Sequence, residues 1–170
     1  MKKVLKTIGW LLLIALVLIQ FFRPAKNIRE GDQPNAISKK FQVSADVKII
    51  LDKACMDCHS NNTRYPWYSN IQPVAWWLNN HVIDGRKELN FDEYITRRPR
   101  FQYRRMEQMI DLVKKKEMPL DSYTWTHKDA ILTEEEKTKL YDWAKSVMNA
   151  LEAQYPIDSL KRPSPPPSQK

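Results

Sequence analysis

The sequence predicts an all-α protein of about four helices preceded by an apolar N-terminal segment. Four stretches place apolar residues at the spacing of three and four that marks one face of a helix. No stretch alternates between apolar and polar residues as a strand does. Thr133, with Glu136 three residues later, forms a capping box that marks a helix start. With 170 residues, the chain has room for one ordinary domain with extensions.

Residues 1–23 are predicted to be a membrane anchor. The stretch from Thr7 to Phe22 has 16 residues without a charge, which corresponds to about 24 Å of helix. Because Lys6 can extend its ammonium group outward, the span approaches the roughly 30 Å hydrocarbon core of a bilayer. A cleaved signal peptide is the alternative, but no small-residue cleavage site follows the apolar stretch. We therefore expect one retained transmembrane helix.

The net charge of +8 does not indicate a nucleic-acid-binding domain, because it lies mostly at the two ends. Residues 1–23 hold four basic residues and no acid, and residues 161–170 hold three and no acid. This leaves a net charge of +1 for residues 24–160. We therefore expect no nucleic-acid partner.

The rest of the chain divides into three segments. Residues 24–42 are polar and interrupted by two prolines and a glycine, so we expect a linker. Residues 43–154 hold the four predicted helices and the chemistry described below. Residues 155–170 end in a proline-rich run and are expected to be a disordered tail.

Each predicted helix has a recognisable start or apolar face. The first begins at the N-cap candidate Ser44 and continues to Cys55. The second covers residues 72–84, with Pro73 in its first turn and Gly85 as its end. The third covers residues 100–116, and the fourth follows the capping box. The apolar faces of the first, third and fourth helices are expected to be Val47, Ile50, Leu51 and Ala54; Gln102, Met106, Met109, Ile110 and Val113; and Leu140, Trp143, Ala144, Val147 and Leu151.

Both cysteines of the chain lie in the stretch "CMDCH", which is the C-x-x-C-H pattern of covalent haem attachment. Thiols three residues apart lie about one helical turn apart, so Cys55 and Cys58 can each form a thioether with one vinyl group of a haem. The imidazole of His59 then projects over the porphyrin, where a neutral ring nitrogen can bind iron. We therefore predict one covalent haem c, with His59 as an iron ligand.

A redox dithiol and half of a zinc site are the alternatives for this motif. A redox C-x-x-C pair usually lies in a βαβ unit, and no strand is predicted here. Zinc would need two of the three histidines as well, and His59 follows Cys58 too closely for the usual ligand spacing.

The prediction of a covalent haem also sets the expected location of the domain. The basic residues on the two flanks of the apolar segment are too evenly matched to give an orientation. Thioethers to haem are made outside the cytoplasmic membrane, so we expect the domain to face the periplasm or outer side.

The second axial ligand of the iron has two main candidates. Met118 ends a predicted helix, and Pro119 favours an extended conformation from which the thioether can point inward. The alternative is that Met118 only packs in the core. His81, on the apolar face of the second predicted helix, would instead give a bis-histidine haem, and His127 is a weaker candidate in a polar loop. Met106 and Met109 are expected to pack in the core.

From Val43 to Met148 the chain resembles the small bacterial haem-binding domain family of c-type cytochromes. The stretches that carry the resemblance are "CMDCHSNNTRYPWYSNIQP", "HVIDGRKELNF" and "KKKEMPLDSYTWTHKDAILTEEEK". More broadly, the order of attachment motif, Met-Pro loop and C-terminal helix is similar to class I cytochrome c. The resemblance implies an all-α, cytochrome c-like haem domain, with His59 as the proximal ligand and Met118 as the distal ligand.

These observations together predict a membrane-anchored mono-haem cytochrome that transfers single electrons to redox partner proteins of unknown identity. Such a protein is an electron carrier rather than an enzyme. Two alternatives need an open distal position: a haem peroxidase, with His81 as acid or base, and a haem-based redox or gas sensor.

Overall fold

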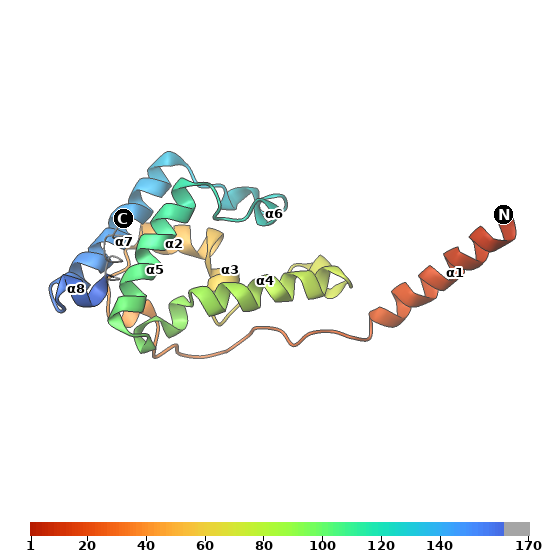
Figure 1. Cartoon of the computed structure of the whole chain (residues 1–170), viewed down its shortest axis with the longest axis horizontal. Coiled ribbons are helices and arrows are strands. Elements are labelled where there is room, and N and C mark those ends of the chain that lie inside the picture. Colours follow the sequence, from red (N-terminus) through yellow and green to blue (C-terminus); the bar gives the residue numbers. More distant parts are fainter. Residues whose placement is uncertain (162–170) are drawn as a thin grey trace, which may run out of the picture.

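The computed structural model describes residues 1–161, and the prolines and serines predicted as a tail at 162–170 lie outside this part. The described residues form eight α-helices and no strand, so the all-α prediction is confirmed. Helix α1 (Lys2–Ile19) projects away from a domain formed by α2 to α8 (Figure 1). The four helices predicted for the domain correspond to α2, α4, α5 and α7, and α3, α6 and α8 are one-turn helices.

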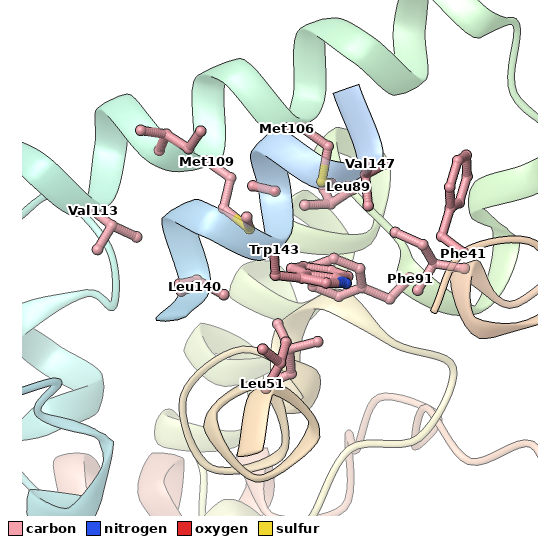
Figure 2. Close-up of a cluster of buried hydrophobic side chains, with 14 of the residues drawn as sticks. Phe41, Leu51, Leu89, Phe91, Met106, Met109, Val113, Leu140, Trp143 and Val147 are labelled. Carbon is pink, nitrogen blue, oxygen red and sulfur yellow. The ribbon is translucent and has the colours of Figure 1, made fainter. Parts of the chain in front are cut away.

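The core forms between helices α2 (Ala45–Ala54), α5 (Pro99–Lys114) and α7 (Glu134–Glu152), and α7 packs on both of the others. The apolar faces predicted for these three helices are all buried. In Figure 2 the indole of Trp143 lies beside Phe91, with 6.2 Å between ring centroids. Met106, Leu140 and Val147 lie above and beside this pair and are almost fully buried. The core thus fixes the helices whose ends carry the candidate site.

Two side-chain caps set the starts of these helices. The Ser44 hydroxyl accepts a hydrogen bond from the backbone N–H of Val47, which begins α2 as predicted. At α7, the Thr133 hydroxyl accepts from the N–H of Glu136, and the Glu136 carboxylate accepts from the N–H of Thr133. The predicted capping box is therefore present.

Helix α4 (Val74–Glu88) differs from its prediction at its end. Gly85 does not stop the helix, which continues through Glu88 before Leu89 becomes extended. Only Ala75 and Val82 of α4 are buried, so most of this helix is partly or fully exposed. Gly85 is needed for a different reason, its close contact with the attachment motif, which is described below.

The segment expected to be a linker packs on the domain. Its apolar residues Ala36, Ile37 and Phe41 are buried, and the 3-10 helix η1 (Ile37–Lys39) lies within it. The side-chain amide of Asn27 donates to Ser60 at 3.0 Å and Thr63 at 2.9 Å.

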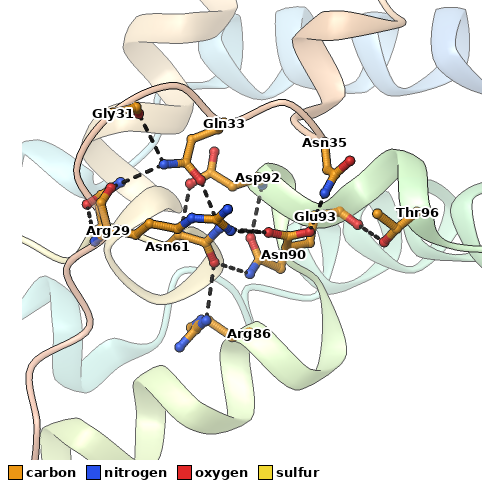
Figure 3. A network of polar contacts seen from close by, with 11 residues as sticks. Arg29, Gly31, Gln33, Asn35, Asn61, Arg86, Asn90, Asp92, Glu93 and Thr96 are labelled. Atoms are coloured by element: carbon orange, nitrogen blue, oxygen red, sulfur yellow. Dashed lines mark hydrogen bonds and ion pairs between the residues drawn. The ribbon is translucent and has the colours of Figure 1, made fainter.

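Farther along the same segment, Gln33 joins a polar network around the buried side chain of Asn61 (Figure 3). The Asn61 amide also contacts Glu93, and its backbone N–H donates to Asp92 of the 3-10 helix η3 (Phe91–Thr96) at 2.8 Å. The chain between α1 and α2 therefore covers the side of the domain just behind the C-x-x-C-H motif.

The predicted transmembrane helix is not supported. In the part of the chain that the structure describes, no helix is both long and apolar enough to cross a membrane. Helix α1 ends at Ile19 instead of continuing through Phe22, and its first turns hold Lys2, Lys3 and Lys6.

After α7, residues expected to be a disordered tail form one more helix. Helix α8 (Ile157–Leu160) packs on α5, and Leu160 is buried there.

Candidate functional site

The C-x-x-C-H motif occupies a one-turn helix at the end of α2. Cys55 ends α2 with φ −130° and ψ −43°, and α3 (Met56–His59) begins directly after it. The backbone N–H groups of Cys58 and His59 both donate to the carbonyl of Cys55, at 3.2 and 3.0 Å. Both cysteines line one cavity, which is described below, and neither is in a disulfide.

Both thiols are held in their protonated form. Burial raises the pKa of Cys55 to about 12, and a negative charge on Cys58 would raise it further. Burial raises the pKa of Cys58 to about 11, with a smaller contribution from the Asp57 carboxylate.

The imidazole of His59 is oriented by the main chain. Its Nδ1 atom lies 2.8 Å from the carbonyl oxygen of Leu89, directly after α4. Burial lowers the pKa of His59, so the ring is neutral at pH 7, although hydrogen bonding to Leu89 acts in the opposite direction. In this tautomer Nδ1 donates its proton to the carbonyl and Nε2 keeps a free lone pair. A histidine held in this way is prepared to bind a metal ion through Nε2.

Two neighbouring cavities lie on either side of this motif. One has a volume of about 280 Å³ and lies between the motif and α4, and the other has about 430 Å³ and lies between the motif and α5. Residues that line both are Ala54, Cys55, His59, Glu88, Met118 and Pro119. The attachment motif and the predicted distal ligand thus border the same apolar space.

The structure separates the candidates for the distal ligand. Met118 lines both cavities, and His81 lines only the smaller one, where its Nδ1 bonds to the Trp77 carbonyl at 2.8 Å. His127 lines neither cavity and instead stacks on Tyr123 with 4.1 Å between ring centroids. Of the two methionines expected to pack in the core, Met106 is fully buried, and Met109 also reaches the larger cavity.

Met118 is positioned by the way α5 ends. Lys116 has a left-handed backbone conformation with φ 60°, an uncommon conformation for a residue with a side chain. After it, the N–H groups of Glu117 and Met118 both donate to the carbonyl of Leu112, at 2.9 and 3.2 Å. This closed turn directs the chain from α5 to the cavity.

A cationic side chain at the larger cavity indicates what kind of ligand fits there. Arg105 lines this cavity, and its guanidinium pairs with Glu88 at 2.6 Å. A haem presents two propionate carboxylates, and a cation at the cavity edge is a suitable partner for such a group. The residues present therefore fit a haem, with an apolar space, two thiols, a neutral imidazole and a cationic edge.

The zinc alternative lacks its ligands. Within residues 1–161, no three histidine, cysteine, aspartate or glutamate side chains gather closely enough to hold one metal ion.

Three features of the site were not predicted from the sequence. Gly85 lies against Cys58, Leu89 accepts from His59, and Arg105 borders the larger cavity. In the sequence, Gly85 indicates only a helix end. The acceptor at Leu89 is a backbone oxygen and has no side-chain signature, and Arg105 is one of several arginines in its region.

Comparison with known proteins also indicates a haem-binding protein. A family model described as a haem-binding domain matches residues 14–146, most of the chain. No curated protein and no solved structure matches the chain.

Proposed function

Because the chain belongs to the haem-binding domain family, we propose that it is a c-type cytochrome that holds one haem covalently and transfers single electrons. Cys55 and Cys58 would form the two thioethers, and His59 and Met118 would supply the two iron ligands. The observation that carries the proposal is the shared lining of the two cavities, where Cys55, His59 and Met118 meet.

The residues of the chain supply attachment, orientation and exclusion of water. Once bound, the haem supplies an iron centre that alternates between the ferric and ferrous states. The bond from His59 to the Leu89 carbonyl keeps the imidazole in one orientation in both states. Met118 offers a thioether, a soft ligand that favours ferrous iron and gives a higher reduction potential than a second histidine.

Covalent attachment is tested by mass. We expect protein made in a host with the haem-attachment machinery to exceed its polypeptide mass by one haem, and the double variant Cys55→Ala, Cys58→Ala to have the polypeptide mass alone. A parent protein without this added mass would contradict the proposal.

The distal ligand is tested with carbon monoxide. We expect the reduced Met118→Ala variant to bind carbon monoxide while the parent does not, since the parent has no free coordination position. Met148→Ala is the matched control, because Met148 is also half-buried but packs on the core away from both cavities. Equal binding by parent and Met118→Ala would exclude Met118 as a ligand.

A second candidate function rests on His81. This residue lines the smaller cavity, its Nδ1 bonds within α4, and its Nε2 has no hydrogen-bond partner in residues 1–161. If Met118 leaves the iron open, His81 can act as the proton acceptor of a peroxidase. Steady peroxide turnover by the parent, lost in His81→Ala, would favour this function over electron transfer.

The location of the protein is also part of the proposal. Thioether formation takes place outside the cytoplasmic membrane, so we place the domain on that side. Nearly all large apolar side chains of α1 are exposed, and such a surface suits association with lipid. We expect the chain in the membrane fraction and the double variant Leu11→Glu, Leu12→Glu in the soluble fraction. Recovery of both in the soluble fraction would contradict membrane association.

A further inference from the structure

The middle of the attachment motif holds a buried carboxylate. Asp57 lies between the two cysteines and is only 6% exposed. Its Oδ1 atom accepts from the backbone N–H of Arg64 at 3.1 Å and from the Arg64 side-chain Nε at 3.0 Å. Its Oδ2 atom accepts from the phenol of Tyr123 at 2.7 Å. A buried charge of this kind is tolerated because each oxygen has strong donors.

Tyr123 belongs to the segment that carries the proposed distal ligand. It lies in the one-turn helix α6 (Asp121–Thr124), and its N–H donates to the carbonyl of Leu120 at 2.9 Å. Tyr123, Leu120 and Met118 all line the smaller cavity. The phenol therefore lies five residues from the thioether, on a short turn that joins them.

The phenol is a permanent donor in this position. Burial raises the pKa of Tyr123, and the hydrogen bond to Asp57 raises it further. The Tyr123 ring is also packed face to face on His127, with 12° between ring planes. The ring position is thus fixed by stacking, and the hydroxyl group adds the contact to the motif.

In the part of the chain that the structure describes, one side-chain hydrogen bond joins residues 117–127 to the attachment motif 55–59. It is the bond from Tyr123 to Asp57. Tyr123 makes one further, longer contact of 3.3 Å to the carbonyl of Lys53. The Tyr68 hydroxyl meets Thr126 at 3.0 Å, farther along the segment. The two sides of the cavity are therefore held together at Asp57.

We infer that the Asp57–Tyr123 hydrogen bond positions Met118 on the iron, so that Tyr123 is a positioning residue for the distal ligand. The inference rests on the proposed function. Without the bond, the segment from Met118 to Tyr123 opens more often, and the iron is exposed to an external ligand. Hydrogen bonds to a charged group change such an equilibrium by about tenfold or more.

The test uses the full haem-loaded protein and imidazole, which binds ferric iron only when the distal position is vacated. We expect Tyr123→Phe, which keeps the stacked ring, to bind imidazole about tenfold more tightly than the parent. The absorption band of the methionine–iron bond should weaken in the same variant. Tyr103→Phe is the matched control, because the Tyr103 phenol donates to Glu152 at 2.6 Å away from both cavities.

A second pair of variants separates positioning from general loosening. In a Met118→Ala background there is no distal ligand to position, so adding Tyr123→Phe should leave imidazole affinity unchanged. The inference is overturned if Tyr123→Phe binds imidazole as the parent does, if Tyr103→Phe has the same effect, or if the effect persists without Met118. A parent that already binds imidazole as Met118→Ala does would instead contradict Met118 ligation in the proposed function.

Discussion

Gly85 of α4 lies directly against Cys58 of the attachment motif. A Cβ atom placed on Gly85 would lie 2.6 Å from the carbonyl oxygen of Cys58 and 3.0 Å from its Cβ. Both neighbouring atoms belong to, or lie next to, the backbone, so they cannot move aside as the end of a long side chain can. The missing side chain allows α4 and α3 to approach at the point where the haem would be attached.

We therefore expect Gly85→Ala to lower the free energy of unfolding by about 1–3 kcal/mol, as overpacking does in other cores. Thermal unfolding of the haem-free protein measures this change. The control is Gly9→Ala in α1, where no atom lies within 4 Å of the added Cβ. If Gly85→Ala is as stable as the parent, the close approach of the two helices is not present in solution.

The raised thiol pKa values predict a pH-dependent reactivity of the haem-free protein. With pKa values of about 12 for Cys55 and about 11 for Cys58, few thiolates exist at pH 8. Alkylation by iodoacetamide should therefore be about a hundredfold slower in the folded than in the unfolded chain, where thiols ionise near pH 8.5. Because the unfolded chain loses these protons first, the free energy of unfolding should fall as pH rises above about 8.5. A reaction rate with its midpoint near pH 8.5 in the folded protein would contradict the burial of the thiols.

The capping box of α7 predicts that removing the Thr133 hydroxyl lowers the stability of the protein. Thr133→Ala should lower the free energy of unfolding by about 1 kcal/mol, because the N–H of Glu136 loses its acceptor. Chemical denaturation is the measurement. Thr138→Ala is a matched control on the same helix, since its hydroxyl bonds only to the Glu134 carbonyl within α7. Equal losses in the two variants would show that the cap contributes nothing specific.

Arg105 gives a prediction about the haem-loaded protein. Its positive charge borders the larger cavity, and a nearby positive charge favours the state that holds the extra electron. Arg105→Gln should therefore have a lower reduction potential than the parent, as measured by redox titration followed by absorption. Arg104→Gln removes a charge from the adjacent, exposed residue, which lines neither cavity, and should change the potential much less. Equal shifts would place Arg105 outside the haem surroundings.

Much of the fold was predictable because the relevant forces are local. The caps at Ser44 and Thr133 and the apolar faces of α2, α5 and α7 are sequence patterns with direct structural causes, and all are present. The spacing of Cys55 and Cys58 likewise predicts two thiols about one helical turn apart, and α3 is a single turn of helix that begins directly after Cys55.

The errors come from contacts between distant segments. Gly85 is a good helix stop by itself, but here the helix continues through Glu88, and Gly85 lies against Cys58 of another element. The polar residues after α1 suggest a linker when seen alone, and only the partners around Asn61 reveal that they bind the domain. The contact of Tyr123 also could not be predicted from the sequence, because its partner is a carboxylate 66 residues away.

The acceptor for His59 is a main-chain oxygen, so substitution at Leu89 does not remove it. A designer who wishes to alter the electronic properties of this centre therefore has little leverage on the imidazole face. Met118 and His81, which also line the smaller cavity, are ordinary side chains and can be exchanged. Redox tuning among natural variants of this domain should accordingly be concentrated there.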